Sequence, residues 1–308
     1  MNGLPPVNRC FAGWLSSLAL VLALGLAPLP AMSAQSFFPS PDAAMDAFGT
    51  AVGNNDEGEL KALLGADFRR LIPPPGAEIR DKFMSGWQAS HTLKANDSDH
   101  AQIAVGKDGW TLPIPLVKTA QGWHFDTRAA VDEMRLRRIG RNELAVIQTM
   151  LAIYDAQRDY ASAYRDGANV YLYADRFTST PGKHDGLYWQ TGPGEDPSPL
   201  GPAFKSAGAR NAAQSGYYGY HYKLLRAQGP HAPGGAYDYM VNGRLFGGFA
   251  VIAWPAKYAE TGIKTFMVSH DGQVYERDLG PDTANEVKGV TTFDPGPGWD
   301  KASVETLP

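Results

Sequence analysis

The stretch that decides the fold is residues 141–162, RNELAVIQTMLAIYDAQRDYAS. Its apolar residues recur in steps of three and four, the period of one helix face, and predict a helix from about Ala130 to Tyr164. They form two adjoining stripes, one of Gly140, Leu144, Ile147, Leu151, Tyr154 and Ala161 and one of Val146, Met150, Ile153 and Tyr160. A bare face this wide would exceed the apolar patches that soluble monomers expose. A sheet or another helix must therefore cover it.

Strands downstream supply such a cover. Four candidates follow a poorly periodic stretch over residues 166–216: Tyr217 to Leu225, Phe249 to Trp254, Thr265 to Ser269 and Val274 to Arg277. Asp271-Gly272, between the last two, is a hairpin signal. A long helix packed on an antiparallel meander sheet predicts an α+β domain over residues 129–308.

Residues 35–128 predict a second α+β domain at the N-terminal side. Ser40 can cap a helix that carries Met45 and Phe48 on its apolar face, and a second short helix ends near Gly65. Three strand candidates follow, His100 to Val105, Gly109 to Val117 and Gly122 to Phe125. The closing strands are similar to those of cystatin-like and nuclear-transport-factor-like folds, which implies a cone-like domain.

Residues 1–34 have the pattern of a secretory signal peptide. Arg9 gives a basic start, an apolar run extends from Trp14 to Leu29, and small residues precede Ala34. A retained membrane helix is the alternative, but the run is short for a span of about 20 residues, and prolines break its end. We expect a periplasmic or secreted mature chain with no transmembrane anchor after cleavage. The single cysteine, Cys10, would leave with the signal peptide.

The charge balance argues against nucleic acid as a partner. The chain has 28 Lys and Arg residues against 32 Asp and Glu residues, a formal net charge of −4, and loss of Arg9 leaves −5. Basic residues do not cluster strongly, as they would on a polyanion-binding surface. The 34 glycines and 23 prolines indicate a loop-rich protein.

The short motifs that reveal a mechanism are absent from the sequence. It has no Gly-x-Ser-x-Gly elbow, no His-Glu-x-x-His, no Cys-x-x-Cys and no phosphate-binding Gly-Lys-Ser/Thr loop. We therefore expect no cofactor, no metal centre and no recognisable catalytic residue. A hydrolase with two carboxylates stays open, because such a pair leaves no spacing to read.

The densest group of reactive side chains lies in residues 182–189, GKHDGLYW. His184 and Asp185 could hold a ligand or share a proton, with Tyr188 and Trp189 as aromatic walls and Glu195 completing the site. In the structural alternative, Asp185 belongs to a turn that His184 caps, and the aromatic rings fill the core. Convergence of His184 and Asp185 with a third acid or histidine in an open cleft would favour the first interpretation.

Several segments, taken in order, are similar to a family of exported bacterial proteins classed only as domain of unknown function 2950. They include residues 122–127 (GWHFDT), 138–144 (RIGRNEL), 182–189 (GKHDGLYW), 198–202 (SPLGP) and 274–280 (VYERDLG). The resemblance covers nearly all of the mature chain. It implies no particular activity.

The C-terminal half also resembles the heads of type IV pilins and pseudopilins. The likeness lies in residues 219–222 (GYHY), 253–255 (AWP) and 271–274 (DGQV), after the long helix. Pilins enter filaments through an apolar N-terminal half-helix, whereas this chain has the charged residues Arg135 to Arg141 and a soluble domain there.

The function expected from these patterns is that of a non-catalytic binding or assembly-accessory module of the bacterial envelope. Its partner would be an envelope protein or a glycan. The alternative is a hydrolase or metal-dependent enzyme that uses the loop with His184 and Asp185.

Overall fold

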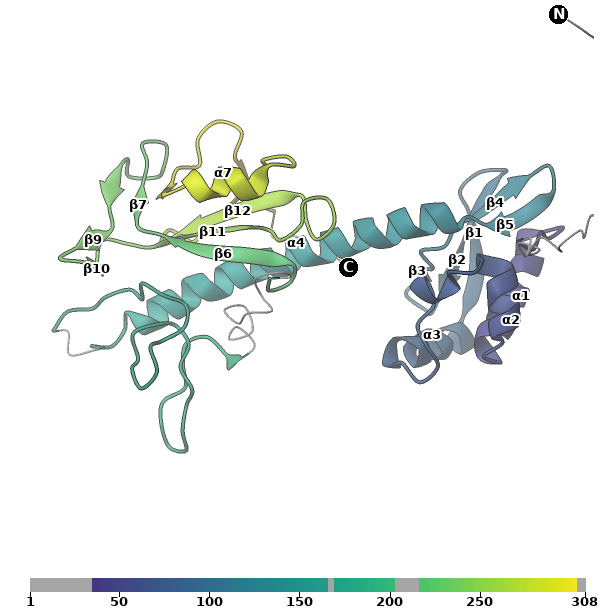
Figure 1. The fold of residues 1–308 in the computed structure, drawn as a ribbon, viewed down its shortest axis with the longest axis horizontal. Coiled ribbons are helices and arrows are strands. Elements are labelled where there is room, and N and C mark those ends of the chain that lie inside the picture. The colour runs from purple at the N-terminus through teal and green to yellow at the C-terminus, as the bar shows by residue number, and fades with distance from the viewer. Residues whose placement is uncertain (1–34, 166–168, 203–215, 304–308) are drawn as a thin grey trace, which may run out of the picture.

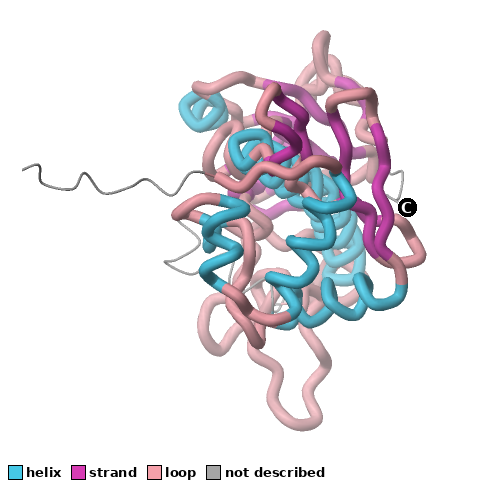
Figure 2. The backbone as a smooth tube through the Cα atoms, turned by 90° about the vertical axis from the view of Figure 1, so that its right-hand side faces the viewer, coloured by secondary structure: helices cyan, strands magenta, loops and turns pink. Residues whose placement is uncertain are grey.

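The structure, a computed structural model, describes residues 35–165, 169–202 and 216–303. The predicted signal peptide lies outside these residues. Two α+β assemblies flank one long helix, α4 (Thr127–Tyr160), which gives the molecule an elongated shape (Figure 1). Seen along the long axis, loops make up much of the backbone beside the helices and strands, as the glycine and proline content predicts (Figure 2).

Helix α4 confirms the predicted long helix with shifted ends. It begins after Asp126, whose carboxylate accepts a hydrogen bond from the amide of Ala129 at 2.9 Å. It ends at Tyr160, so Tyr164 lies beyond it. An aspartate at this position satisfies one of the free amides of the first turn, which explains the earlier start.

The buried face of α4 is centred on the second apolar stripe rather than the first. Val146, Met150 and Ile153 are fully buried, whereas Leu144 and Leu151 are only half-buried. Leu151, on the first stripe, packs against the edge of this core. Fully buried Gln157 continues the second stripe with the same spacing, a position that its polarity conceals in the sequence.

The sheet that covers α4 is antiparallel, in the order β15-β13-β12-β11-β6. Its strands are β6 (Tyr220–Leu225), β11 (Ala250–Pro255), β12 (Lys264–Ser269), β13 (Val274–Asp278) and β15 (Asp300–Lys301). Alternate residues of β11 face opposite sides: Val251 packs in a core with α4, and Ile252 packs in a core with α7 (Thr283–Gly289). The four predicted strands are thus confirmed as a layer between two helices.

Short strands extend this side of the molecule. β7 (Ala227–Gln228), β8 (Tyr237–Asp238) and β14 (Thr292–Phe293) form a three-stranded sheet, and β9 (Met240–Val241) pairs with β10 (Arg244–Leu245) as a hairpin. The hairpin turn is Asn242-Gly243, with φ angles of 49° and 76°. Two successive positive φ values are those of a type I′ turn, which asparagine and glycine adopt readily.

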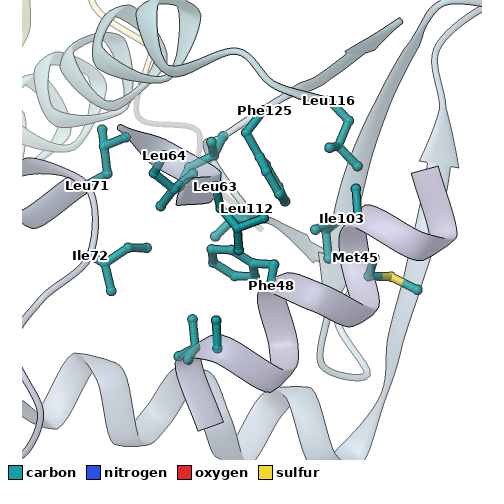
Figure 3. Packing of buried hydrophobic residues seen from close by; sticks show 14 of the residues in the cluster. Met45, Phe48, Leu63, Leu64, Leu71, Ile72, Ile103, Leu112, Leu116 and Phe125 are labelled. Carbon is teal, nitrogen blue, oxygen red and sulfur yellow. The ribbon is translucent and has the colours of Figure 1, made fainter. Parts of the chain in front are cut away.

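The N-terminal assembly packs three α-helices and a short 3₁₀ helix against a second antiparallel sheet. The helices are α1 (Pro41–Gly53), α2 (Glu57–Leu64), η1 (Phe68–Arg70) and α3 (Glu78–Ala89). The strands are β1 (His91–Ala95), β2 (His100–Val105), β3 (Trp110–Thr111), β4 (Leu116–Thr119) and β5 (Gly122–Phe125). Phe48 and Phe125 meet at the centre of its core (Figure 3).

The prediction of one continuous strand from Gly109 to Val117 is wrong. The chain forms β3 and β4 separately and leaves Pro113 and Pro115 between them. A proline has no amide hydrogen to donate to a neighbouring strand, so the ladder cannot run through both positions.

Helix α3 and strand β1 were not predicted. The cap of α1 is confirmed, since the Ser40 hydroxyl accepts a hydrogen bond from the amide of Ala43 at 3.1 Å.

Polar contacts join both assemblies to the middle of α4. Arg137 donates to the Thr111 carbonyl at 2.6 Å on the N-terminal side. Asn142 donates to the Thr261 carbonyl at 2.8 Å on the C-terminal side. The buried core residues of the N-terminal side come from residues 44–130, and those of the two cores on the other side come from residues 146–302. No helix among residues 35–165, 169–202 and 216–303 has the length and apolar character needed to cross a membrane.

Candidate functional site

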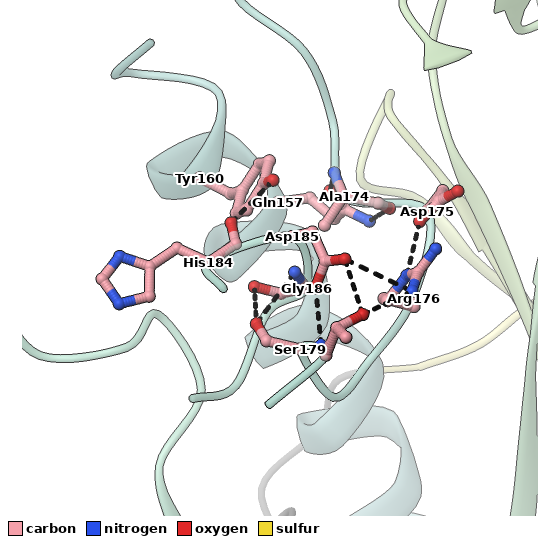
Figure 4. Close-up of polar contacts among 10 residues, drawn as sticks. Gln157, Tyr160, Ala174, Asp175, Arg176, Ser179, His184, Asp185 and Gly186 are labelled. Atoms are coloured by element: carbon pink, nitrogen blue, oxygen red, sulfur yellow. Dashed lines mark hydrogen bonds and ion pairs between the residues drawn. The ribbon is translucent and has the colours of Figure 1, made fainter. Parts of the chain in front are cut away.

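The loop of residues 169–202 is fastened to the end of α4 (Figure 4). The Gln157 side chain donates to the carbonyl of Ala174 and accepts from its amide, both at 2.8 Å. The hydroxyl of Tyr160, one turn later, donates to the carbonyl of His184 at 3.0 Å. These bonds satisfy backbone groups that burial would otherwise leave unpaired, and they fix the loop without regular secondary structure.

Asp185 holds the loop closed. Its carboxylate accepts from the Thr180 amide at 2.7 Å and hydroxyl at 2.8 Å, and it lies 3.3 Å from a guanidinium nitrogen of Arg176. Partial burial alone would raise the pKa of this carboxyl group, but the Thr180 hydrogen bonds and the Arg176 charge outweigh it and lower the pKa. Asp185 is therefore a fixed, ionised group.

His184 does not converge with Asp185. Its exposed imidazole points away from the polar cluster (Figure 4) and stacks on the indole of Trp189, with ring centroids 4.4 Å apart. The two neighbouring residues thus face different environments. This geometry does not support a shared proton or a shared metal ion.

The remaining predicted site residues are dispersed. Tyr188 and Trp189 are buried in the core beneath the loop, as the structural alternative expected of the aromatic rings. Glu195 is exposed, and its carboxylate accepts from the Gly192 amide at 2.9 Å within its own turn. Of the five predicted residues, only Asp185 lines the cavity described next.

A cavity of about 430 Å³ opens between the end of α4, the loop and the β9–β10 hairpin. Hydrogen bonding from the Tyr173 amide to the Leu245 carbonyl, at 2.9 Å, joins the loop to the hairpin. The charged residues of the lining are Arg165, Arg176, Lys183, Arg244, Asp175 and Asp185, a net charge of +2. A concave surface with this excess of cations favours anionic ligands.

Two of the lining arginines are held in defined positions. Arg176 pairs with Asp175 at 3.0 Å as well as with Asp185. Arg165 donates through Nε to the Tyr160 carbonyl at 3.2 Å, and its guanidinium carbon lies 5.1 Å from the ring centroid of Trp189. Buried Trp189 therefore contributes to the cavity indirectly, by a cation–π contact that positions Arg165.

The sequence did not predict Arg165 or Arg244 as site residues. They are far apart in the chain, and only the fold brings them to one cavity. A local signal for Arg244 exists in Asn242-Gly243, a hairpin dipeptide that places the next residue at the start of a strand. No comparable local signal marks Arg165.

Metal ligands do not gather in the described part of the chain. No group of three or more histidine, cysteine, aspartate or glutamate residues is placed to hold a metal ion there. Both carboxylates of the cavity already pair with Arg176. The donor set of the cavity therefore suits an anion better than a cation.

Comparison with known proteins identifies a family. No curated protein and no solved structure matches the chain. A family described as "Protein of unknown function (DUF2950)" matches residues 35–302, which is most of the sequence. The chain therefore belongs to this family.

Proposed function

We propose that the mature chain is an exported, non-catalytic binding module that takes an anionic ligand into the cavity between α4, the loop and the β9–β10 hairpin. The observation that carries this proposal is the lining itself, with four cationic and two acidic side chains. Its volume of about 430 Å³ is within the range typical of small-molecule sites.

The charge pairing within the cavity supports an anionic ligand. Asp175 and Asp185 both pair with Arg176. Lys183 and Arg244 have no side-chain ion pair within the described residues. A carboxylate or phosphate would supply the missing counter-charge, and a charge-assisted hydrogen bond to arginine is among the stronger polar contacts in proteins.

Two features support binding rather than catalysis. The lowered pKa of Asp185 keeps its carboxylate ionised near neutral pH, which is unsuited to donating a proton as a general acid. The diverging side chains of His184 and Asp185 leave the alternative hydrolase without the pair it would use.

Export is part of the proposal. It is supported by the signal-peptide pattern of residues 1–34 and by a family match that begins at residue 35. A periplasmic or secreted location follows from the same pattern.

Calorimetric titration with citrate, a small carboxylate anion, tests the binding proposal at constant ionic strength. Arg244→Ala removes one exposed cation of the cavity, and Arg141→Ala removes an exposed arginine from the middle of α4 as a matched control. We expect Arg244→Ala to weaken binding about tenfold or more, since hydrogen bonds to charged groups are worth roughly 1.5–3 kcal/mol. Equal affinities in the two variants would contradict the proposed site.

A second candidate, an accessory role in envelope assembly, draws on the likeness to pilin heads. It is supported by α4 packed on an antiparallel sheet and by exposed Val131 and Leu136 on the helix segment before that sheet. Analytical ultracentrifugation of the mature chain tests it. A defined oligomer that Leu136→Ser dissociates would support assembly, and a monomer at high concentration would argue against it.

A further inference from the structure

We infer that the anionic ligand is an acidic saccharide, with its carboxylate among the cavity cations and a sugar ring against the stacked pair of Tyr164 and Tyr171. This inference rests on the proposed function and adds the chemical class of the ligand. It depends on these two tyrosine side chains, which lie outside the charged lining of the cavity.

Tyr164 and Tyr171 form an exposed aromatic surface. Their rings stack with centroids 4.7 Å apart and planes 21° from parallel. The two residues nonetheless stay 62% and 54% exposed. Large aromatic side chains gain free energy from burial, so a stacked pair left in solvent is a surface suited to a partner with an apolar face. The C–H face of a pyranose ring is such a partner.

The aromatic pair adjoins the cavity along the chain. Tyr164 lies between the lining residues Ala163 and Arg165, and Tyr171 directly precedes the lining residue Leu172. Consecutive Cα atoms are only about 3.8 Å apart, so the pair lies within the span of one or two sugar residues from the cavity. The inference requires a single ligand to contact the tyrosine rings and the cations together.

The acids of the cavity favour a saccharide over a nucleotide. The carboxylates of Asp175 and Asp185 are hydrogen-bond acceptors beside the cations, and sugar hydroxyl groups are donors. The two tyrosine rings also stack on each other and leave no slot between them in which a base could be clamped.

Titration of the mature chain with matched sugars tests the inference. N-acetylmuramic acid and digalacturonate are the acidic probes and represent two sources, wall glycan and uronate polymer. N-acetylglucosamine has the ring of the first probe without its carboxylate. Citrate represents an anion without a sugar, and adenosine monophosphate represents a nucleotide. We expect at least one acidic sugar to bind more tightly than N-acetylglucosamine, citrate and the nucleotide.

Variants of the tyrosine pair separate stacking from charge. Tyr164→Ala and Tyr171→Ala should weaken binding of the acidic sugar about twofold to tenfold, while citrate affinity stays unchanged. Tyr164→Phe and Tyr171→Phe keep the rings and should bind within about twofold of the unaltered chain. Arg244→Ala should weaken the acidic sugar and citrate alike. Both exposed tyrosines lie outside the buried core, so these variants should still fold.

The outcomes distinguish this inference from the proposed function. If citrate binds through Arg244 but no acidic sugar binds more tightly, the anion site stands and the saccharide inference is overturned. Tighter binding of the nucleotide, or equal affinities in the alanine and phenylalanine variants, also overturns it. If no anion binds the unaltered chain, the proposed function fails as well.

Discussion

Replacement of Gln157 by leucine is the most demanding test of how the loop is attached. Gln157 is fully buried, and its amide group makes two hydrogen bonds of 2.8 Å with the backbone of Ala174. Leucine has a similar size and helix propensity, so Gln157→Leu changes little else in α4. It leaves the amide and carbonyl of Ala174 without their partner.

The magnitude follows from those two orphaned groups. A buried backbone group without a hydrogen bond costs about 1–3 kcal/mol, so two of them should lower the free energy of unfolding by about 2–6 kcal/mol. Part of this cost is offset because leucine is more apolar than glutamine. If the loop opens locally, the loss appears instead as faster hydrogen exchange at Ala174.

The assay is urea denaturation together with amide hydrogen exchange. Gln148→Leu is the matched control, because Gln148 is exposed on the same helix. The control should change the free energy of unfolding by no more than about 0.5 kcal/mol. If Gln157→Leu behaves like the control in stability and in exchange at Ala174, Gln157 does not fasten the loop.

Three further predictions follow from the core, the loop and the N-terminus. Met150→Ala should cost roughly 2–5 kcal/mol in urea denaturation and half-buried Leu151→Ala clearly less; equal costs would contradict the assignment of the buried stripe. Because the folded pKa of Asp185 is lowered, its charge stabilises the fold above the unfolded pKa of about 3.9, and this stabilisation is lost as the pH falls through the folded pKa. The free energy of unfolding of Asp185→Asn should thus lie below that of the unaltered chain at pH 7 and converge with it in acid; a difference independent of pH would exclude the charge as its source. N-terminal sequencing of the exported protein should start at Ala34 or Gln35, and a full-length cytoplasmic species as the main product would refute export.

Periodicity predicted the long helix and its sheet because both depend on local patterns. The apolar spacing of residues 144–160 requires a helix, and Asp271-Gly272 forms the expected turn between β12 and β13. Spacing alone did not reveal which of two adjoining stripes is buried more deeply, because the strands that pack against α4 lie 60 or more residues further along the chain. Gln157 was missed because burial of a glutamine depends on the backbone groups that a distant loop brings to it.

The candidate site could be predicted only in part. Residues 182–189 do lie in a structured loop beside a cavity, and Asp185 lines it. A dense run of reactive side chains in the sequence does not bring them together, since His184 and Asp185 are neighbours in the chain and point in different directions. The cationic character of the cavity comes from residues 165, 176, 183 and 244, a set that only the fold assembles.

Hydrogen exchange with and without citrate tests most directly whether an anion binds in this cavity. Citrate should slow exchange in two separate segments, residues 172–187 of the loop and residues 240–245 of the β9–β10 hairpin. Arg244→Ala should abolish this protection at the same citrate concentration, and Arg141→Ala should retain it. Protection confined to other segments, or none at a concentration that saturates the calorimetric titration, would contradict an anion site between the loop and the hairpin.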